Sequence, residues 1–297
     1  MIPYNRKPHV SADVNGTAVA DFTSQQINAD SKTVESFGEE WNRFGTFTEA
    51  EIQRAGEQYF DIVTENMLNK NSVCLDIGCG SGRWSKFISQ RAGFVEAIDP
   101  SEAVIPAVKL TQPCGNIRVT RAGYGCIPFE KESFDFVFSL GVVHHLPDTQ
   151  GAITEAASMV KKNGWLLLYI YYSLDNRSGF YKFIFNCSNI VRRVISSMPQ
   201  GLKNFFCDFI AVTVYLPFVA LTRFVQLFSE AAAKKVPLSY YADKPWKVIR
   251  NDSLDRFGTP LEKRFSKKEI TEMLNKAGMQ DICFSDNEPY WHVVAKK

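Results

Sequence analysis

The sequence predicts an open α/β sheet of parallel strands, on two observations. From residue 72 onward, short apolar runs alternate with helical patterns, and strands that alternate with helices of this length pair in parallel through right-handed crossovers. The first run ends in three alternating glycines, Gly78-x-Gly80-x-Gly82, which indicate a tight turn into a helix. The strands fit 72–77, 94–99, 116–120, 134–139 and 165–171, and the helices between them fit 82–91, 101–110 and 149–162.

The N-terminal part, residues 1–70, is expected to be an arm followed by two helices. Residues 1–30 show no sustained period, which predicts a loose arm. A helix over 32–44 is predicted by apolar residues at spacings of three and four, namely Val34, Phe37, Trp41 and Phe44. A second helix is predicted to begin at the capping box Thr48-x-x-Glu51.

The alternation of strands and helices stops after Tyr172, and residues 173–260 are predicted to form a helical insertion rich in aromatic and basic residues. A further helix is predicted to begin at the capping box Ser266-x-x-Glu269. Two final strand-like runs predict an antiparallel hairpin at the edge of the sheet. Residues 71–172 and 261–297 are therefore expected to form the core.

Composition narrows the classes of protein and of site. A formal net charge of +2 argues neither for nucleic acid nor for an acidic partner. The seven cysteines form no CxxC pair, and Cys74-x4-Cys79 has no second pair at ligand spacing, so we expect reduced thiols and no metal site. The N-terminus lacks the order of a signal peptide, which predicts a cytoplasmic location. The most apolar stretch, Phe209–Thr222, falls short of the roughly 20 residues that span a bilayer.

The glycine loop predicts a bound small molecule, because glycines let the backbone approach a ligand and present amides at a helix N-terminus. A nicotinamide cofactor would need G-x-G-x-x-G, which this loop does not match. The carboxylate of Asp76, two residues before the first glycine, would repel a pyrophosphate. The pattern favours a ligand that carries an amino group.

Five motifs in order carry a family resemblance: LDIGCGSG (75–82), EAIDPS (96–101), IPFEKESFDFVFS (127–139), VVHHLPD (142–148) and VKKNGWLLL (160–168). With them the chain resembles the class I S-adenosyl-L-methionine (SAM)-dependent methyltransferases, in particular the type-11 group, over about 72–172 and 266–297. The resemblance implies a Rossmann-like seven-stranded sheet of order 3-2-1-4-5-7-6 with strand 7 antiparallel. It also implies an N-terminal helical lid, SAM as cofactor and S-adenosyl-L-homocysteine as product.

The resemblance assigns roles around this cofactor. Asp99, at the end of the second strand, is expected to accept both ribose hydroxyls through charge-assisted hydrogen bonds. Asp76 is expected to help hold the ammonium group, or alternatively to cap the loop as a strand-end carboxylate. Gly123 replaces the acidic residue that often meets the adenine, so backbone groups near Tyr124 and Gly125 are expected to take over. The predicted cofactor-binding residues are Phe37, Trp41, Asp76, Gly78, Cys79, Gly80, Asp99, Pro100, Tyr124, Gly125 and Leu140.

The aromatic side chains of Phe37 and Trp41 have two interpretations. They cover the sulfonium of the cofactor through cation–π attraction, or they pack the helix over 32–44 onto the sheet. We expect at least one of them near the cofactor.

The candidate catalytic residues follow two neighbouring strands. His144 and His145 come after the fourth strand, where an imidazole can remove a proton from the acceptor. His145 matches the more usual family position, and its alternative role is to hold the turn. Tyr171 and Tyr172, after the fifth strand, are expected to line the acceptor pocket, whereas Tyr169 is expected to pack in the core.

Residues 177–235 carry eight Lys or Arg against Asp208 and Glu230, interleaved with aromatic side chains. This pattern predicts contact with an anionic membrane surface or enclosure of an apolar substrate, and its alternative is an ordinary helical cap. The segment follows the fifth strand, so we expect it to select the acceptor.

The expected function is transfer of a methyl group to a small-molecule or lipid-linked metabolite, with O, N and C acceptors all open. An RNA or protein methyltransferase and a non-catalytic SAM-binding subunit are the alternatives. No nucleic-acid partner is expected, because Ser139-Leu140-Gly141-Val142 stands where adenine and glutamine methylating families place their Asp/Asn-Pro-Pro-aromatic motif.

Overall fold

The computed structural model describes residues 1–23, 28–44, 47–174, 179–287 and 291–297. The chain divides into two compact units. We call Met1–Asp175 together with Leu261–Lys297 the sheet unit, and Asn176–Pro260 the helical unit.

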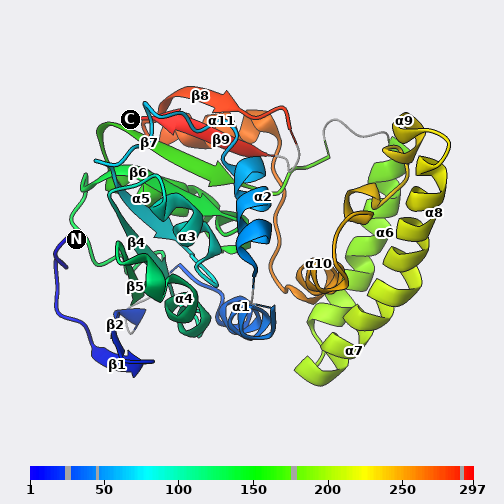
Figure 1. The fold of residues 1–297 in the computed structure, drawn as a ribbon, viewed down its shortest axis with the longest axis horizontal. Coiled ribbons are helices and arrows are strands. Elements are labelled where there is room, and N and C mark those ends of the chain that lie inside the picture. The colour runs from blue at the N-terminus through cyan, green and yellow to red at the C-terminus, as the bar shows by residue number, and fades with distance from the viewer. Residues whose placement is uncertain (24–27, 45–46, 175–178, 288–290) are drawn as a thin grey trace. The chain divides into compact units, whose positions relative to one another are not determined.

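The sheet unit contains a nine-stranded sheet in the order β1-β2-β5-β4-β3-β6-β7-β9-β8 (Figure 1). Its strands are β1 (Val10–Val14), β2 (Thr17–Asp21), β3 (Val73–Ile77), β4 (Phe94–Asp99), β5 (Ile117–Arg121), β6 (Phe134–Leu140), β7 (Val160–Tyr169), β8 (Gln280–Phe284) and β9 (His292–Lys296). The strands from β2 to β7 pair in parallel, whereas β9 is antiparallel to both β7 and β8. The predicted Rossmann-like α/β class is confirmed.

The predicted count of seven strands was wrong, because β1 and β2 form an antiparallel hairpin that extends the β5 edge. The hairpin meets β5 through the single register pair Asp21 and Arg121. Its turn is Asn15-Gly16, and both residues have positive φ, as hairpin turns of this kind require. The described part of residues 1–30 is therefore not a loose arm, contrary to the prediction. The Asn15-Gly16 dipeptide was the sequence signal for this hairpin.

The residues before this hairpin are also held to the sheet. The amide of Ile2 donates to Glu96 Oε1 at 2.9 Å, and the Tyr4 hydroxyl lies 2.7 Å from Thr120 Oγ1. Arg118 donates to both oxygens of the buried Glu96 at 2.7 and 2.8 Å, which compensates a charge that would be costly without a partner. The N-terminal residues are thus bonded to side chains of β4 and β5.

Apolar side chains of the strands alternate between two cores. In β3, Leu75 and Ile77 belong to one core and Cys74 belongs to the other. In β6, Val137 belongs to the first of these cores, and Phe136 and Phe138 belong to the second. Because successive side chains of a strand point to opposite faces, the two cores lie on opposite faces of the sheet.

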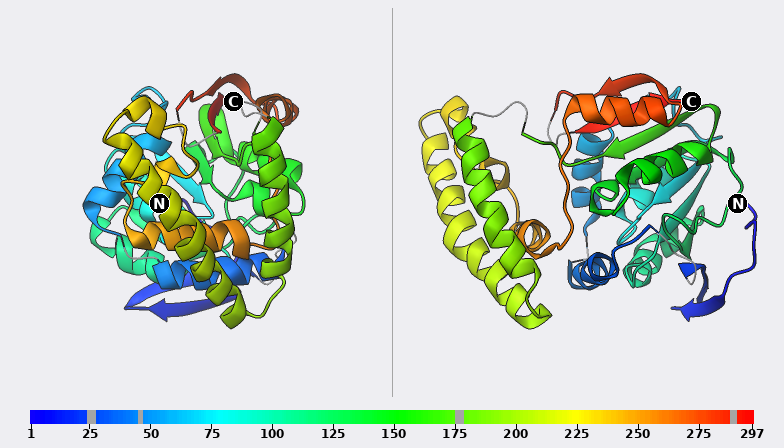
Figure 2. Two further views of the ribbon diagram at one scale, coloured as in Figure 1. Left: turned by 90° about the vertical axis from the view of Figure 1, so that its right-hand side faces the viewer. Right: turned by 180° about the vertical axis from the view of Figure 1, so that it is seen from behind.

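Helices cover both faces of this sheet (Figure 2). They are α1 (Ser31–Phe44), α2 (Glu49–Tyr59), α3 (Arg83–Ser89), α4 (Val104–Thr111), α5 (Thr149–Met159) and α11 (Lys267–Lys276). Both predicted capping boxes are present, one between Thr48 and Glu51 and the other between Ser266 and Glu269. The side chain of Phe44, which was placed on the aromatic stripe of the first helix, lies outside the described residues.

The helical unit has the helical character that its sequence predicts. Its α-helices are α6 (Gly179–Ser196), α7 (Gln200–Ile210), α8 (Leu216–Gln226), α9 (Glu230–Ala233) and α10 (Trp246–Gly258). A π-helical turn over Ala211–Tyr215 joins α7 directly to α8 (Figure 1). The result is one continuous helix of 27 residues, Gln200–Gln226.

Within the described part of the chain, Gln200–Gln226 is the one helix that is long and apolar enough to cross a membrane. Phe209–Thr222, which was predicted to be too short to span a bilayer, is part of this longer helix. Neither Pro217 within that stretch nor Asp208 before it ends the helix. Pro217 lies in the first turn of α8, directly after the π-helical turn Ala211–Tyr215, and the helix continues through it. Asp208 is paired with Arg250 through hydrogen bonds of 2.9 and 2.6 Å.

Candidate active site

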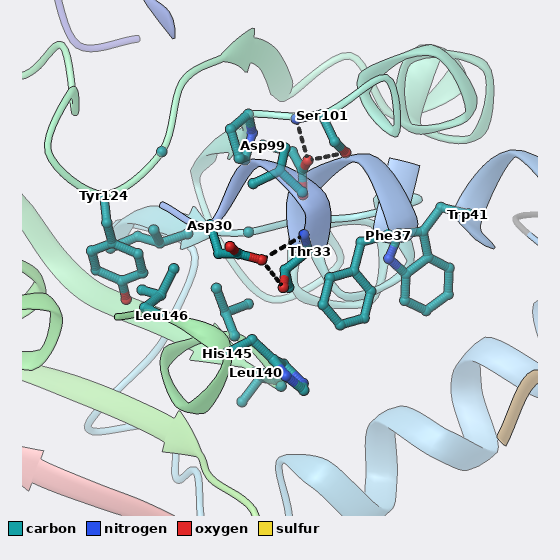
Figure 3. Close-up of a pocket in the computed structure, with 17 residues that line it drawn as sticks. Asp30, Thr33, Phe37, Trp41, Asp99, Ser101, Tyr124, Leu140, His145 and Leu146 are labelled. Atoms are coloured by element: carbon teal, nitrogen blue, oxygen red, sulfur yellow. Dashed lines mark hydrogen bonds between the residues drawn. The ribbon is translucent and has the colours of Figure 1, made fainter. Parts of the chain in front are cut away.

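A cavity opens where β3, β4 and β6 end at their carboxyl termini, which is the edge at which open α/β sheets bind ligands (Figure 3). Five segments contribute to its wall. They supply Asp30, Thr33, Val34, Phe37 and Trp41; Ile77 and Gly78; Asp99, Pro100 and Ser101; Gly123 and Tyr124; and Leu140, Gly141, Val142, His145 and Leu146.

Gly78 is the glycine of the loop that lines this cavity. The amides of Gly78 and Cys79 both donate to the Ile98 carbonyl, at 2.8 and 2.9 Å. In this structure these two amides are therefore bonded within the protein. Gly78 has a φ of +79°, and a Cβ placed on it would lie 2.5 Å from Val142 Cγ2, so only glycine fits this position.

Asp99 is the carboxylate that joins the ends of β3 and β4 at the cavity. Its Oδ2 accepts from the Gly80 amide at 2.9 Å, and its Oδ1 accepts from the Ser101 amide and hydroxyl at 2.9 and 2.6 Å. Burial raises the pKa of Asp99, and these hydrogen bonds oppose the rise. Three bonds leave acceptor capacity on a carboxylate, which has about four lone-pair sites. Ser101 was missed in the sequence, although Asp99-Pro100-Ser101 has the spacing of an Asp that bonds the backbone two residues on.

Helix α1 supplies one wall of the cavity. Phe37 and Trp41 both line it, as Figure 3 shows, so the aromatic stripe does more than pack the helix. Asp30 caps this helix, because its Oδ2 accepts from the Thr33 amide at 2.9 Å and from the Thr33 hydroxyl at 2.5 Å. Sequence reasoning missed Asp30 and Thr33, and the Asp-x-x-Thr spacing of an N-cap was the available signal.

His145 lines the cavity and is almost fully buried. Its Nδ1 lies 2.7 Å from the Leu261 carbonyl oxygen, and its ring meets Phe37 edge-on with centroids 4.9 Å apart. A carbonyl only accepts hydrogen bonds, so Nδ1 carries the proton in the neutral ring and Nε2 is the basic nitrogen. The arrangement positions an imidazole that can accept a proton at Nε2.

His144 does not line the cavity. Its ring is fully buried and stacks on Tyr171 with centroids 4.0 Å apart, and its Nδ1 accepts from the Tyr171 amide at 3.4 Å. Burial, together with His145 and Arg264, lowers the pKa of His144 well below its usual value. The ring is a neutral structural group here, contrary to its place among the predicted catalytic residues.

Tyr171 and Tyr172 are likewise absent from the cavity wall. Tyr172 forms a β-bridge with Phe265 and packs edge-on against Trp291 at 5.7 Å. Their predicted role in the acceptor pocket has no support from the cavity as the structure shows it. Tyr169 packs against Tyr59 at 5.0 Å in one of the two cores, as expected.

Several predicted cofactor residues lie behind the cavity wall. Asp76 is buried beneath the loop and accepts from the Ser85 hydroxyl at 2.6 Å, and burial raises its pKa to about 8. This position fits the alternative role of a carboxylate that caps the loop. The amide of Gly125 donates to both oxygens of Glu155, at 3.0 and 2.8 Å, while the neighbouring Tyr124 does face the cavity.

The charged side chains of the cavity wall are acidic. Asp30 and Asp99 are its carboxylates, and none of the wall residues that the structure describes is Lys or Arg. Across the described ranges, no cluster of three or more His, Cys, Asp or Glu could hold a metal ion. Such a wall favours a cationic ligand and disfavours a pyrophosphate.

Comparison with known proteins places the cavity wall between Ile77 and Leu146 in a recognised domain. Residues 75–168 match a family model described as "Methyltransferase domain". Over 196 residues the chain is 26% identical to a ubiquinone biosynthesis O-methyltransferase of Hydrogenovibrio crunogenus, covering 64% of this chain and 75% of that protein. It is 34% identical over 104 residues to a tRNA U34 carboxymethyltransferase of Pseudoalteromonas translucida, covering 33% of this chain and 32% of that protein.

Among solved structures, a Bordetella parapertussis protein described as a possible exported protein superposes with a TM-score of 0.51 at 14% identity. The alignment covers 88% of this chain and 79% of that one. At this identity the likeness concerns the fold alone.

Proposed function

Because this chain is a class I SAM-dependent methyltransferase, we propose that it methylates a hydroxyl group of a small or lipid-linked metabolite, with the cavity beside Asp99 as its cofactor site and His145 as its base. The reaction belongs on the cytoplasmic side of the cell. The observation that carries the proposal is the single imidazole on an acidic, aromatic cavity wall, with its Nδ1 held 2.7 Å from a backbone carbonyl.

The cavity wall fits the proposed cofactor in its charge, its aromatic rings and its hydrogen-bond acceptors. SAM carries a sulfonium and an ammonium group, and Asp30 and Asp99 give the wall negative charge. Phe37 and Trp41 present aromatic rings to the same space, where a cation is attracted to their faces. Asp99 keeps acceptor capacity for a ribose hydroxyl beyond its three bonds to the protein, and Gly78 lines the cavity without a side chain.

When bound, SAM supplies a methyl group on a good leaving group, so the protein mainly has to align the acceptor and exclude water. In our proposal the acceptor oxygen attacks that methyl group, and His145 Nε2 takes the hydroxyl proton as the new O–C bond forms. The Leu261 carbonyl stabilises the resulting imidazolium through the Nδ1 hydrogen bond. The C–S bond would break as the O–C bond forms and its electron pair would stay on sulfur, so no residue of the protein has to protonate the leaving group.

Support for a hydroxyl acceptor comes from the basic nitrogen at the cavity and from the O-methyltransferase relative. That relative is named for ubiquinone biosynthesis, and the second relative for tRNA, so the acceptor class is the point to test.

The direct test incubates the purified chain and a lysate with methyl-labelled SAM and then separates lipid, small-molecule, RNA and protein fractions. We expect label in the lipid or small-molecule fraction, on an ether or ester oxygen. Label in RNA alone would overturn the proposed acceptor while leaving the cofactor site intact. SAM binding without label in any fraction would favour a non-catalytic subunit.

A further inference from the structure

The exposed large apolar side chains of the described residues are concentrated on the helical unit. Seventeen such side chains are exposed, and fifteen of them lie between residues 190 and 246. Phe205, Phe209 and Phe224 are 62%, 55% and 59% exposed, and Leu227 is 78% exposed. A soluble surface rarely carries so many apolar groups together unless something binds there.

Nine of these fifteen side chains lie on the continuous helix Gln200–Gln226, and Leu227 and Phe228 directly follow it. Three more, Ile190, Val191 and Val194, lie on α6. Exposed apolar residues recur at steps of three and four, at Leu202, Phe205, Phe209, Val212 and Leu216. The interleaved stripe of Lys203, Cys207, Ala211, Tyr215 and Val219, at steps of four, is buried. The helix therefore has a buried face and an exposed face, and both are largely apolar.

The buried face packs against α10 within the helical unit (Figure 1). Polar groups belong to this contact, since Asp208 is paired with Arg250 and the Tyr215 hydroxyl donates to Asp252 Oδ2 at 2.6 Å. Asp252 also accepts from Tyr241. A helix that keeps such partners on one side cannot be surrounded by lipid, which argues against a span across the bilayer.

The helical unit carries a net positive charge, which favours a negatively charged binding partner. Residues 176–260 hold twelve Lys or Arg against five Asp or Glu, whereas the rest of the chain holds 22 against 27. Arg193 is exposed in the last turn of α6, and Lys234 and Lys235 are exposed directly after α9. Arg177 and the side chain of Lys182, which belong to the predicted basic set, lie outside the described residues.

We propose that the exposed apolar face of α6 to α8 docks in the plane of an anionic lipid bilayer, with the basic residues of the helical unit at the phospholipid headgroups. Cations beside an apolar helix face are the pattern of interfacial helices on anionic membranes. A second copy of the chain is the less favoured occupant, because two units of the same strong positive charge repel each other. The inference does not depend on which acceptor is methylated.

Vesicle flotation tests the proposal. The full chain is floated with vesicles of phosphatidylcholine alone and with vesicles that also contain phosphatidylglycerol. We expect it to float with the anionic vesicles, and we expect the bound fraction to fall as salt is raised, because the Debye length shortens. No flotation with any composition would overturn the proposal.

Substitutions identify the face. The double variant Phe209→Ser/Phe224→Ser should lower the vesicle partition coefficient about a hundredfold, about one decade for each aromatic side chain removed from the interface. Val10→Ser is the matched control, because Val10 is 53% exposed on the sheet unit, and it should bind as the unchanged chain does. Equal loss in both variants would overturn the assignment of the face.

Three further measurements exclude the other occupants of the face. A lower melting temperature of the double variant without vesicles would show that the face is covered inside the folded chain, and would overturn the proposal. Sedimentation equilibrium that shows dimers of the unchanged chain, lost in the double variant, would assign the face to a second copy instead. Resistance to alkaline carbonate extraction would indicate a spanning helix and would overturn docking in the plane.

Discussion

The backbone amide of Gly80 donates a 2.9 Å hydrogen bond to Asp99 Oδ2, and this bond joins the loop after β3 to the end of β4. Asp99 therefore has two tasks, since it holds the glycine loop in place and presents its carboxylate to the cavity. A change at this residue alters the shape of the loop together with the charge of the site.

Replacing Asp99 with Asn should weaken SAM binding roughly ten- to a hundredfold, because hydrogen bonds to a charged group are worth about 1.5–3 kcal/mol. The amide also places a donor where the Gly80 or Ser101 amide now donates. Calorimetry measures the affinity. Glu102→Gln is the control, because this nearby carboxylate is half exposed, pairs with Arg121 and does not line the cavity. Equal affinities of the Asn variant and the control would contradict the cofactor placement.

Replacing His145 with Asn separates a base from a structural group. Asn retains a donor near the position of Nδ1, so the bond to the Leu261 carbonyl can persist, but it has no basic nitrogen at the position of Nε2. We expect the turnover number to fall about 10²- to 10⁴-fold, with SAM affinity and melting temperature unchanged. His145→Ala, which also removes the Leu261 bond, should lower the melting temperature in addition. If the Asn variant keeps turnover that the Ala variant loses, His145 has a positioning role and is not the base.

Asp76 should make the free energy of unfolding depend on pH. Its pKa rises from 3.8 to about 8 in the folded chain, because burial disfavours the charged form. Between these values the folded state holds a proton that the unfolded state has lost, so this group lowers stability as pH rises, by about 1.4 kcal/mol per pH unit at most. Asp76→Asn should therefore flatten the fall in the free energy of unfolding between pH 5 and pH 8. Urea denaturation at both pH values measures it, and parallel curves for the two proteins would contradict the buried protonated carboxyl.

Asp76→Asn also decides between the two roles given to this residue. A loop cap that never meets the ligand predicts unchanged SAM affinity at pH 7. A carboxylate that holds the ammonium group predicts a loss of about tenfold or more, by the same charge-assisted bond energy. Calorimetry on the folded variant distinguishes them.

Gly78→Ala should destabilise the chain more than Gly16→Ala does. Both glycines have nearly the same positive φ, at +79° and +78°, so both variants bear the same backbone strain of about 1–2 kcal/mol. Only Gly78 adds a steric conflict, because its Cβ would meet Val142 at 2.5 Å, whereas no atom lies within 4 Å at Gly16. Overpacking of this kind costs about 1–3 kcal/mol more.

A double-mutant cycle with Val142→Ala checks the origin of that difference. Removing the Val142 methyl groups should return part of the stability lost in Gly78→Ala and none of that lost in Gly16→Ala. Additive effects at 78 and 142 would show that the conflict with Val142 is not the cause.

Patterns that are local in sequence predicted most of the sheet unit. The strand ending at Asp99, the capping boxes at Thr48 and Ser266, and the helix that brings Phe37 to the cavity each depend on short-range periodicity or capping. The hairpin at Asn15 was missed because exposed, short strands carry little alternation, and the turn dipeptide was the one available signal.

Sequence reasoning was least successful where long-range contacts decide the role of a side chain. His144 and His145 are adjacent and of the same type, but only His145 lines the cavity, because Tyr171 stacks on His144 and Leu261 binds His145. Asp76 and Asp99 both end strands, yet Ser85 holds one beneath the loop while the other lines the cavity. None of these partners can be deduced from spacing along the chain.

The backbone bond at His145 has a mechanical consequence. Leu261, whose carbonyl sets the tautomer of His145, is the first residue of the sheet unit after the helical unit ends at Pro260. The buried Arg192 of α6 binds the carbonyls of Thr259 and Pro260, at 3.0 and 3.1 Å. Only the peptide bond from Pro260 to Leu261 separates these two anchors. A substitution at Arg192 is therefore expected to alter the backbone next to Leu261, and with it the carbonyl that the His145 ring binds.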